Sequence, residues 1–239
     1  AGIFAGGSDF TFLISDGKTL VLLKDSKNLW EGSLSGKEVT DIKFDEKNNL
    51  FWILSKESVS SFNPQNNQLA EVYSGINLTS FEVTAGKLIV GTTDGYFEID
   101  SKTGKQVGDI QRKMPWTEIT SVSEIDGKIW FGSTWGAMKL RDDGKFDYYA
   151  SQRWLPSDTV VHIAKGPENS VLVLTNRGLG RIFFKEMTLY DKAMFYDKQV
   201  RERHIRTGFN ATVGRMTNGD VTTGTLENSD NDGLWTAMY

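Results

Sequence analysis

Four short apolar segments recur along the chain at nearly constant spacing, and each comes directly after a turn. Their first aliphatic residues are Leu50, Leu88, Ile129 and Val171, so the successive spacings are 38, 41 and 42 residues. Residues that tolerate tight turns, such as Gly and Asn, flank these segments on both sides. A β-type repeat of about 40 residues indicates propeller blades rather than helical repeats.

Each repeat contains four predicted strands. An inner strand precedes the apolar segment, a third strand follows a second turn, and a more polar outer strand closes the unit. The inner strands are predicted at residues 39–44, 78–83, 119–122 and 160–164. A two-sheet sandwich is the alternative, but it does not require repeats of constant length. We therefore expect an all-β fold, a β-propeller of about five four-stranded blades.

The fifth blade in this count is a fainter and shorter unit at the start of the chain, between Phe10 and Trp30. We expect it to be degenerate beside the four clear repeats. Two arrangements stay open at this point. The blades either close on themselves or form part of a larger propeller.

The β pattern breaks near residue 186. Residues 186–206 contain no Gly or Pro, with Asp191 near the start and Arg203 near the end, which suits a helix dipole. We predict a helical excursion there. The domain division is then residues 1–185 for the blades and residues 186–239 for a helix plus a glycine-rich segment. That segment either closes the propeller or leads to a further domain.

Composition excludes several classes of function. The chain has 239 residues, 38% hydrophobic, and no cysteine, which excludes disulfides, zinc–thiolate sites and cysteine nucleophiles. A net charge of -4 argues against a nucleic-acid partner. Only two histidines exist, too few for a multi-histidine metal site. No apolar run approaches the roughly 18 residues of a spanning helix, so we expect no membrane insertion.

The segment from Asp126 to Gly136 carries a family resemblance. The pattern is a strand, then Asp-Gly, then an aliphatic residue, Trp, an aromatic residue and Gly. Residues 87–95 match the same pattern more loosely. Over residues 35–185 the chain resembles the propeller repeats of bacterial two-component sensors. The resemblance implies an extracellular propeller that recognises ligands, often carbohydrate-derived. We therefore expect a secreted or periplasmic module that binds a glycan or a protein.

The tail carries a second resemblance. From His204 to Tyr239 it is similar to the junction between such propellers and an α/α-toroid of carbohydrate-processing enzymes. This implies a helical domain in the same polypeptide, with this chain as part of a longer protein. A competing interpretation makes residues 233–239 another inner strand, because Gly-Leu-Trp-Thr also resembles a blade sequence.

One motif suggests a cation site. Asn228, Asp230 and Asp232 offer oxygen atoms at alternate positions, and Gly233 follows where a calcium loop turns sharply. The position of the usual bidentate Glu is Tyr239, so Glu227 or Asp220 would have to complete the site. Calcium is the expected cofactor if the motif binds a metal. The alternative is a metal-free Asn/Asp-rich turn.

Aromatic residues supply the ligand-binding candidates. Trp116, Trp135 and Trp154 lie in or near turns at 19-residue intervals, with Tyr149 close by. Loops at one face of a propeller converge, and flat rings suit the apolar faces of sugars. The alternative is that each ring fills a gap between blades.

The catalytic candidates are His204, Arg206 and Tyr196. An Arg could neutralise a uronate carboxylate while His or Tyr takes a proton, as in a polysaccharide lyase. An ordinary solvated helix face is the alternative. The sequence thus favours a recognition module, with part of a lyase or glycoside hydrolase, or a purely structural domain, as alternatives.

Overall fold

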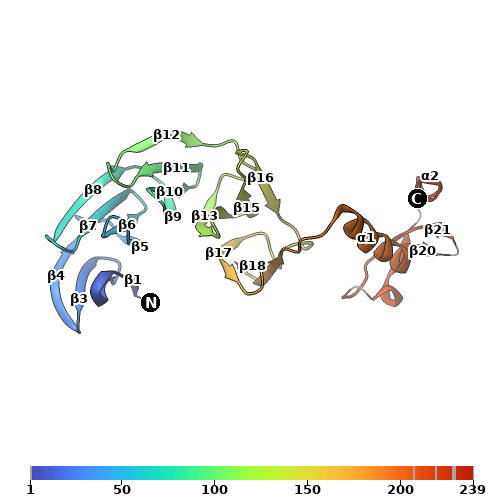
Figure 1. Ribbon diagram of the computed structural model, residues 1–239, viewed down its shortest axis with the longest axis horizontal. Coiled ribbons are helices and arrows are strands. Elements are labelled where there is room, and N and C mark those ends of the chain that lie inside the picture. Colours follow the sequence, from blue (N-terminus) through green and yellow to red (C-terminus); the bar gives the residue numbers. More distant parts are fainter. Residues whose placement is uncertain (1, 207, 219, 228–229, 239) are drawn as a thin grey trace. The chain divides into compact units, whose positions relative to one another are not determined.

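The computed structural model describes residues 2–206, 208–218, 220–227 and 230–238. The chain divides into two compact units, Ala1–Phe184 and Lys185–Tyr239. The first unit, called the blade arc below, is built of antiparallel sheets packed one after another (Figure 1).

Four sheets of the arc are four-stranded meanders in which consecutive strands pair. The first sheet is β1 (Ile3–Gly6), β2 (Thr11–Ser15), β3 (Thr19–Lys24) and β4 (Lys27–Ser33), with a short 3-10 turn η1 (Ser8–Phe10) after β1. The second is β5 (Val39–Asp45), β6 (Leu50–Ser55), β7 (Ser58–Asn63) and β8 (Gln68–Ser74). The third is β9 (Leu78–Thr84), β10 (Lys87–Thr92), β11 (Gly95–Asp100) and β12 (Gln106–Gln111). The fourth is β13 (Ile119–Ile125), β14 (Lys128–Ser133), β15 (Gly136–Leu140) and β16 (Phe146–Tyr149).

The fifth sheet has three strands among the described residues: β17 (Val160–Gly166), β18 (Ser170–Thr175) and β19 (Gly178–Phe183). The second, third and fourth sheets match the expected repeats, whereas the first and the fifth differ from the expectation. The first unit is a complete four-stranded sheet, although its sequence looked degenerate. The last apolar segment matches the repeat pattern clearly. After Phe183, however, the next element among the described residues is a helix and not an outer strand.

In the second, third and fourth sheets, successive residues of the second strand face opposite neighbouring sheets. On β6, Phe51 and Ile53 join the core between the first and second sheets, whereas Trp52 and Leu54 join the next core. All four are at most 1% exposed. A strand covered on both faces reads as a continuous apolar run instead of an alternating one. This is why the second strands were the visible repeat.

A hydroxyl ends the second strand of each sheet and holds the following turn. Ser133 Oγ donates to the Gly136 carbonyl at 2.7 Å and accepts the Trp135 N–H at 3.1 Å. Ser55, Thr92 and Thr175 make the corresponding pairs of bonds. The repeated hydroxyl satisfies turn groups that would otherwise lie buried without partners.

The second unit is called the C-terminal unit. It consists of α1 (Leu189–Arg203), β20 (Ile205–Arg206), β21 (Phe209–Asn210), β22 (Thr212–Gly214), η2 (Val221–Thr223), β23 (Thr225–Glu227) and α2 (Asp232–Met238). The Thr188 hydroxyl caps α1 by accepting the Asp191 N–H at 3.1 Å. The helix expected near residues 186–206 is therefore confirmed as α1.

The interpretation of residues 233–239 as an inner strand is wrong for the residues that the structure describes. They belong to α2, whose Trp235 N–H donates to the Asn231 carbonyl at 2.9 Å. Local similarity to a blade sequence does not make a strand without a partner strand to pair with. Among the described residues, neither unit contains a helix that is long and apolar enough to cross a membrane.

Candidate binding surface on one face of the blade arc

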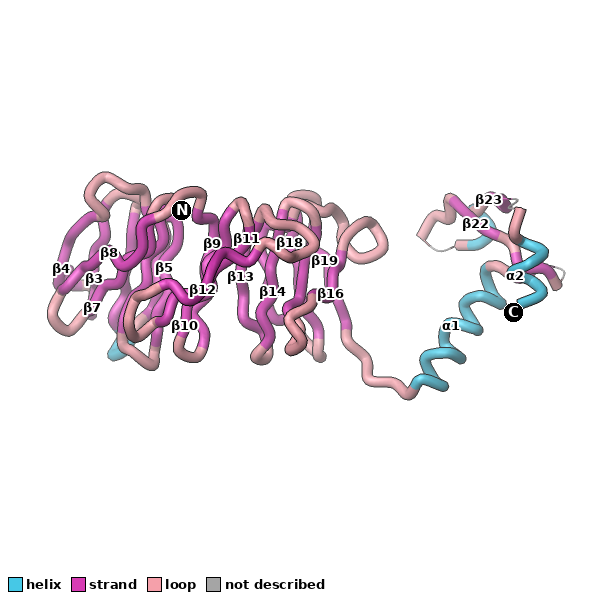
Figure 2. Tube along the Cα trace, turned by 90° about the horizontal axis from the view of Figure 1, so that it is seen from above, coloured by secondary structure: helices cyan, strands magenta, loops and turns pink. Residues whose placement is uncertain are grey.

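The meander topology sorts the loops of the arc onto two faces. Turns between second and third strands, and connections from one sheet to the next, fall on the same face, because each strand reverses direction (Figure 2). We call this the loop face. It consists of the turns 16–18, 56–57, 93–94, 134–135 and 176–177 and the connections 34–38, 75–77, 112–118 and 150–159.

Backbone hydrogen bonds join these loops to one another. Thr134 N–H donates to the Glu118 carbonyl at 3.1 Å, so the turn of the fourth sheet is held by the connection before it. Gly136 N–H donates to the Asp158 carbonyl at 2.7 Å, which ties the same turn to the connection after it. Corresponding bonds hold the turns of the second, third and fifth sheets. Because backbone hydrogen bonds connect its loops, the loop face presents its side chains in defined positions.

Trp116 and Trp135 form an exposed aromatic pair on the loop face. Their ring centroids are 5.9 Å apart, and the side chains are 39% and 54% exposed. Trp116 Nε1–H donates to Thr134 Oγ1 at 2.7 Å, and that hydroxyl donates to Glu118 Oε2 at 2.6 Å. The hydroxyl of Tyr148 donates to the Trp135 carbonyl. The pair is thus exposed and also fixed by hydrogen bonds.

Trp154 and Tyr149 lie together in the same sector, but their exposure differs. Trp154 is 44% exposed and meets Tyr149 edge to face at 5.3 Å, with the Arg153 guanidinium 5.6 Å from its ring. Tyr149 is only 9% exposed and stacks on Trp130 at 5.5 Å in the core between the fourth and fifth sheets. Burial raises the pKa of its hydroxyl to about 12. Tyr149 therefore lies in the core beneath the exposed ring of Trp154.

A pocket of about 460 Å³ opens where three inner strands begin at the loop face. The second residue of each of these strands, Thr40, Thr79 and Thr120, lines it. The remaining lining residues are Lys56, Asn77, Leu78, Thr93 and Ile119. We call this the threonine pocket. The connection that contains Trp116 ends at Ile119, one of the residues that line this pocket.

The three threonines differ in their hydrogen bonding. Thr120 Oγ1 donates to the Val160 carbonyl at 2.8 Å and Thr40 Oγ1 to the Leu54 carbonyl at 3.2 Å. The buried hydroxyl oxygen of Thr79 has no partner. A buried hydroxyl without a partner is costly, and a ligand in the pocket could bond it once the Thr79 side chain turns this oxygen toward the pocket. Our sequence interpretation missed this pocket, although threonines at spacings of 39 and 41 residues were a visible signal.

Charged groups lie further along the inner strands. Lys43 Nζ and Glu82 Oε2 join the second and third sheets at 2.7 Å. Burial raises the pKa of Asp41, the nearby Lys43 ammonium opposes this shift, and the Glu82 carboxylate adds to it. The exposed His162 of β17 also lowers the pKa of Asp41, as the smallest of these effects.

The catalytic candidates lie in the C-terminal unit. His204 follows the end of α1, where its Nδ1 lies 3.2 Å from the Ala211 carbonyl and its own carbonyl accepts the Ala211 N–H at 2.8 Å. Tyr196 is half exposed on α1, edge to face with Phe195. The side chain of Arg206 lies outside the described residues. The lyase interpretation stays a prediction, and the described contacts of His204 are those of a helix end.

The predicted calcium motif is described only in part. Asn228 lies outside the described residues, while Asp230 precedes α2 and Asp232 begins it. In the part of the chain that the structure describes, no group of three His, Cys, Asp or Glu side chains is arranged to hold a metal ion. The calcium site stays a prediction.

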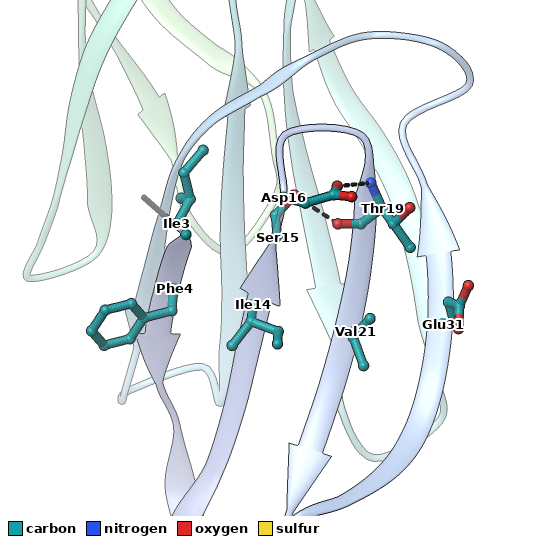
Figure 3. A pocket seen from close by; sticks show the side chains of 9 residues that line it. Ile3, Phe4, Ile14, Ser15, Asp16, Thr19, Val21 and Glu31 are labelled. Atoms are coloured by element: carbon teal, nitrogen blue, oxygen red, sulfur yellow. Dashed lines mark hydrogen bonds between the residues drawn. The ribbon is translucent and has the colours of Figure 1, made fainter.

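A pocket larger than the threonine pocket lies on the first sheet, away from the loop-face aromatics. It measures about 690 Å³ and lies over the first sheet, on Phe4, Ile14 and Val21 (Figure 3). Asp16 stands at its rim, and the N–H groups of Thr19 and Lys18, each at 2.8 Å, hold the pKa of its carboxyl below the usual range. Its floor is the uncovered face of the first sheet.

No protein-family model and no curated protein matches this sequence. Solved structures do match. The extracellular domain of a hybrid two-component system protein from Bacteroides thetaiotaomicron has a TM-score of 0.64 and 14% identity, over 77% of this chain and 27% of that one. Virginiamycin B lyase from Staphylococcus aureus has a TM-score of 0.58 and 11% identity, over 77% and 71%.

A third structure, a gluconolactonase from Xanthomonas campestris, has a TM-score of 0.56 and 12% identity, over 74% of this chain and 70% of that one. The predicted resemblance to two-component-type propellers is thus confirmed at the level of the fold. The chain spans about a quarter of the sensor domain that it matches. Because propellers carry both sensing and enzymatic functions, the likeness decides the fold and not the activity.

Proposed function

We propose that the blade arc is a recognition module of an extracellular or periplasmic protein, and that it binds a glycan on the loop face. The observation that carries the proposal is the exposed Trp116–Trp135 pair, held by its own hydrogen bonds beside a polar pocket. Exposed tryptophans that are already ordered lose little conformational entropy when a ligand stacks on them.

The threonine pocket supplies the polar half of the proposed site. Sugars present hydroxyl groups that both donate and accept, and the Thr79 hydroxyl and the Asn77 carboxamide can do the same. Lys56 is the charged residue among the described lining residues. We therefore expect an acidic oligosaccharide, such as one containing uronate, to bind more tightly than a neutral one of equal length.

Tryptophan fluorescence measures the proposed binding directly. We would titrate the chain with acidic and neutral oligosaccharides and compare the wild type with Trp135→Ala and Thr79→Val. Loss of a stacking ring should weaken binding about tenfold, or about 1.4 kcal/mol. Thr79→Val preserves the shape of the side chain, so a weaker affinity would report the hydroxyl alone.

Phe10→Ala is the matched control, because Phe10 is an exposed aromatic residue on the opposite face, in the turn after β1. Equal losses in Phe10→Ala and Trp135→Ala would contradict the proposal, as would the absence of glycan binding by the wild type. A protein ligand, the other partner indicated by the sequence, has no described contact that favours it.

A further inference from the structure

Both end sheets of the arc leave one apolar face uncovered. On the first sheet, Phe4 is 67% and Phe12 43% exposed, and the pocket of about 690 Å³ lies over this face (Figure 3). On the fifth sheet, Leu174 is 43%, Leu179 59% and Phe183 56% exposed. Contiguous exposed apolar faces of this kind mark places where another surface packs.

Leu174 and Leu179 of the fifth sheet occupy positions that are buried in the inner sheets. In the strand pairing, Leu174 of the fifth sheet is equivalent to Gly132 of the fourth sheet and Gly91 of the third. Each of them pairs with an inner-strand residue next to a shift in register. A Cβ on Gly132 would meet Val160, and one on Gly91 would meet Ile119, both within 2.6 Å. Val160 and Ile119 are the first residues of the next inner strand. Leu174 therefore stands where the inner strand of a following sheet would begin.

The fifth sheet also has a free edge. Strands β4, β8, β12 and β16 close the first four sheets, whereas β19 has no outer partner among the described residues. Leu179 and Phe183 lie on this strand. An unpaired edge beside an exposed apolar face attracts further strands and is normally covered in a folded protein.

We propose that further four-stranded blades of the same propeller cover the two end faces of the arc, and that a strand pairs with β19. The occupant follows from continuity, because each inner interface is made by equivalent positions of adjacent blades. Direct closure of the arc on itself is disfavoured, since no core cluster of the described residues joins the first sheet to the fifth. This inference rests on the fold and is independent of the proposed ligand.

The matched enzymes indicate how many further blades the proposal requires. The match covers about 70% of the gluconolactonase and virginiamycin B lyase chains. If five blades correspond to that share, the remainder has room for about two more blades of similar size. We therefore expect blades and not a single capping loop.

The absence of cysteine makes single-cysteine labelling a clean test. Leu179→Cys probes the proposed interface, and Phe4→Cys probes the other end. Val107→Cys is the control, since Val107 is 51% exposed on β12, an outer strand of an inner sheet. Maleimide labelling rates are compared in residues 1–239 and in the polypeptide expressed from the whole reading frame.

In residues 1–239 all three cysteines should react at similar rates. In the whole polypeptide, Leu179→Cys and Phe4→Cys should react at least tenfold more slowly than Val107→Cys. Equal rates in the whole polypeptide would overturn the proposal. Protection that disappears on dilution would also overturn it and point to a second copy of the chain.

A double variant, Phe4→Cys with Leu179→Cys, tests closure of the arc on itself. A short bis-maleimide should not join the two cysteines within one molecule of residues 1–239. Efficient intramolecular crosslinking would mean that the first and fifth sheets meet directly, and the proposed further blades would then be excluded.

Discussion

The two units of this chain are stabilised in different ways. The blade arc buries large side chains such as Trp52, Trp130 and Phe97 almost completely, whereas Val213 is the one buried residue among those described in the C-terminal unit. Both helices of that unit have no buried residue, and Leu189 is 84% exposed. The difference shows that the arc has its own core, while the C-terminal unit is held mainly by caps and local hydrogen bonds.

The sharpest way to break this comparison is a pair of truncations. Trp130→Ala removes a ring packed between the fourth and fifth sheets and should lower the free energy of unfolding by about 3–5 kcal/mol. Leu189→Ala should change it by less than about 0.5 kcal/mol. Urea unfolding followed by tryptophan fluorescence measures the arc, because Trp235 is the one tryptophan outside it. A large loss of unfolding free energy in Leu189→Ala would show that α1 has an apolar partner, and the two units would then not differ in this way.

A second pair compares one hydroxyl in each unit. Ser133→Ala removes both bonds that hold a loop-face turn and should cost the arc about 1 kcal/mol. Thr188→Ala removes the cap of α1 and should fray that helix without moving the unfolding midpoint of the arc. Far-UV circular dichroism at the helix minimum and fluorescence of the arc separate the two effects. A shifted arc midpoint in Thr188→Ala would mean that the two units unfold together.

The smallest expected effect concerns the charge buried on an inner strand. Burial raises the pKa of Asp41 above its ordinary 3.8, so the folded state binds this proton more tightly than the unfolded state. The contribution of Asp41 to stability is therefore present below pH 3.8 and is lost as the pH rises through the raised pKa. Asp41→Asn should be more stable than the wild type at pH 7 and equal to it at pH 3.

Asp142→Asn is the control of opposite sign. The Lys128 ammonium holds the pKa of the exposed Asp142 carboxyl below its usual range. The wild-type carboxylate therefore stabilises the folded state above pH 3.8, and this gain is lost as the pH falls through the lowered pKa. If Asp41→Asn lowers the stability at pH 7, as Asp142→Asn should, burial is not the cause of the Asp41 shift.

Much of the fold could be predicted because the pattern of turn and apolar segment recurs along the sequence. The inner strands begin at residues 39, 78, 119 and 160, as the spacing of the apolar segments indicates. The first sheet was harder to predict because its turn and register differ from the others. Ser15 bonds the carbonyl four residues on, where the later sheets use three, and β1 pairs without a register shift.

The candidate site could be predicted only in outline. The sequence suggested that Trp116, Trp135 and Trp154 share a loop surface, and the topology places all three on the loop face. It could not tell that Tyr149 lies beneath Trp154 in the core, because aromatic residues occur both in the loops and in the core of this chain. It also gave no reason to join Thr40, Thr79 and Thr120, which come together only when three sheets pack side by side.

The sequence by itself determined the repeat, the four-strand pattern and the helix after the arc, because these depend on local periodicity and turn chemistry. The tertiary structure alone decided which aromatic rings are exposed, where the pocket opens and that both end faces stay uncovered. Burial depends on the neighbouring sheets, and the residues that line the pocket with Thr79, such as Thr40 and Thr120, lie about 40 residues away along the chain. Local patterns carry no information about a partner at that distance.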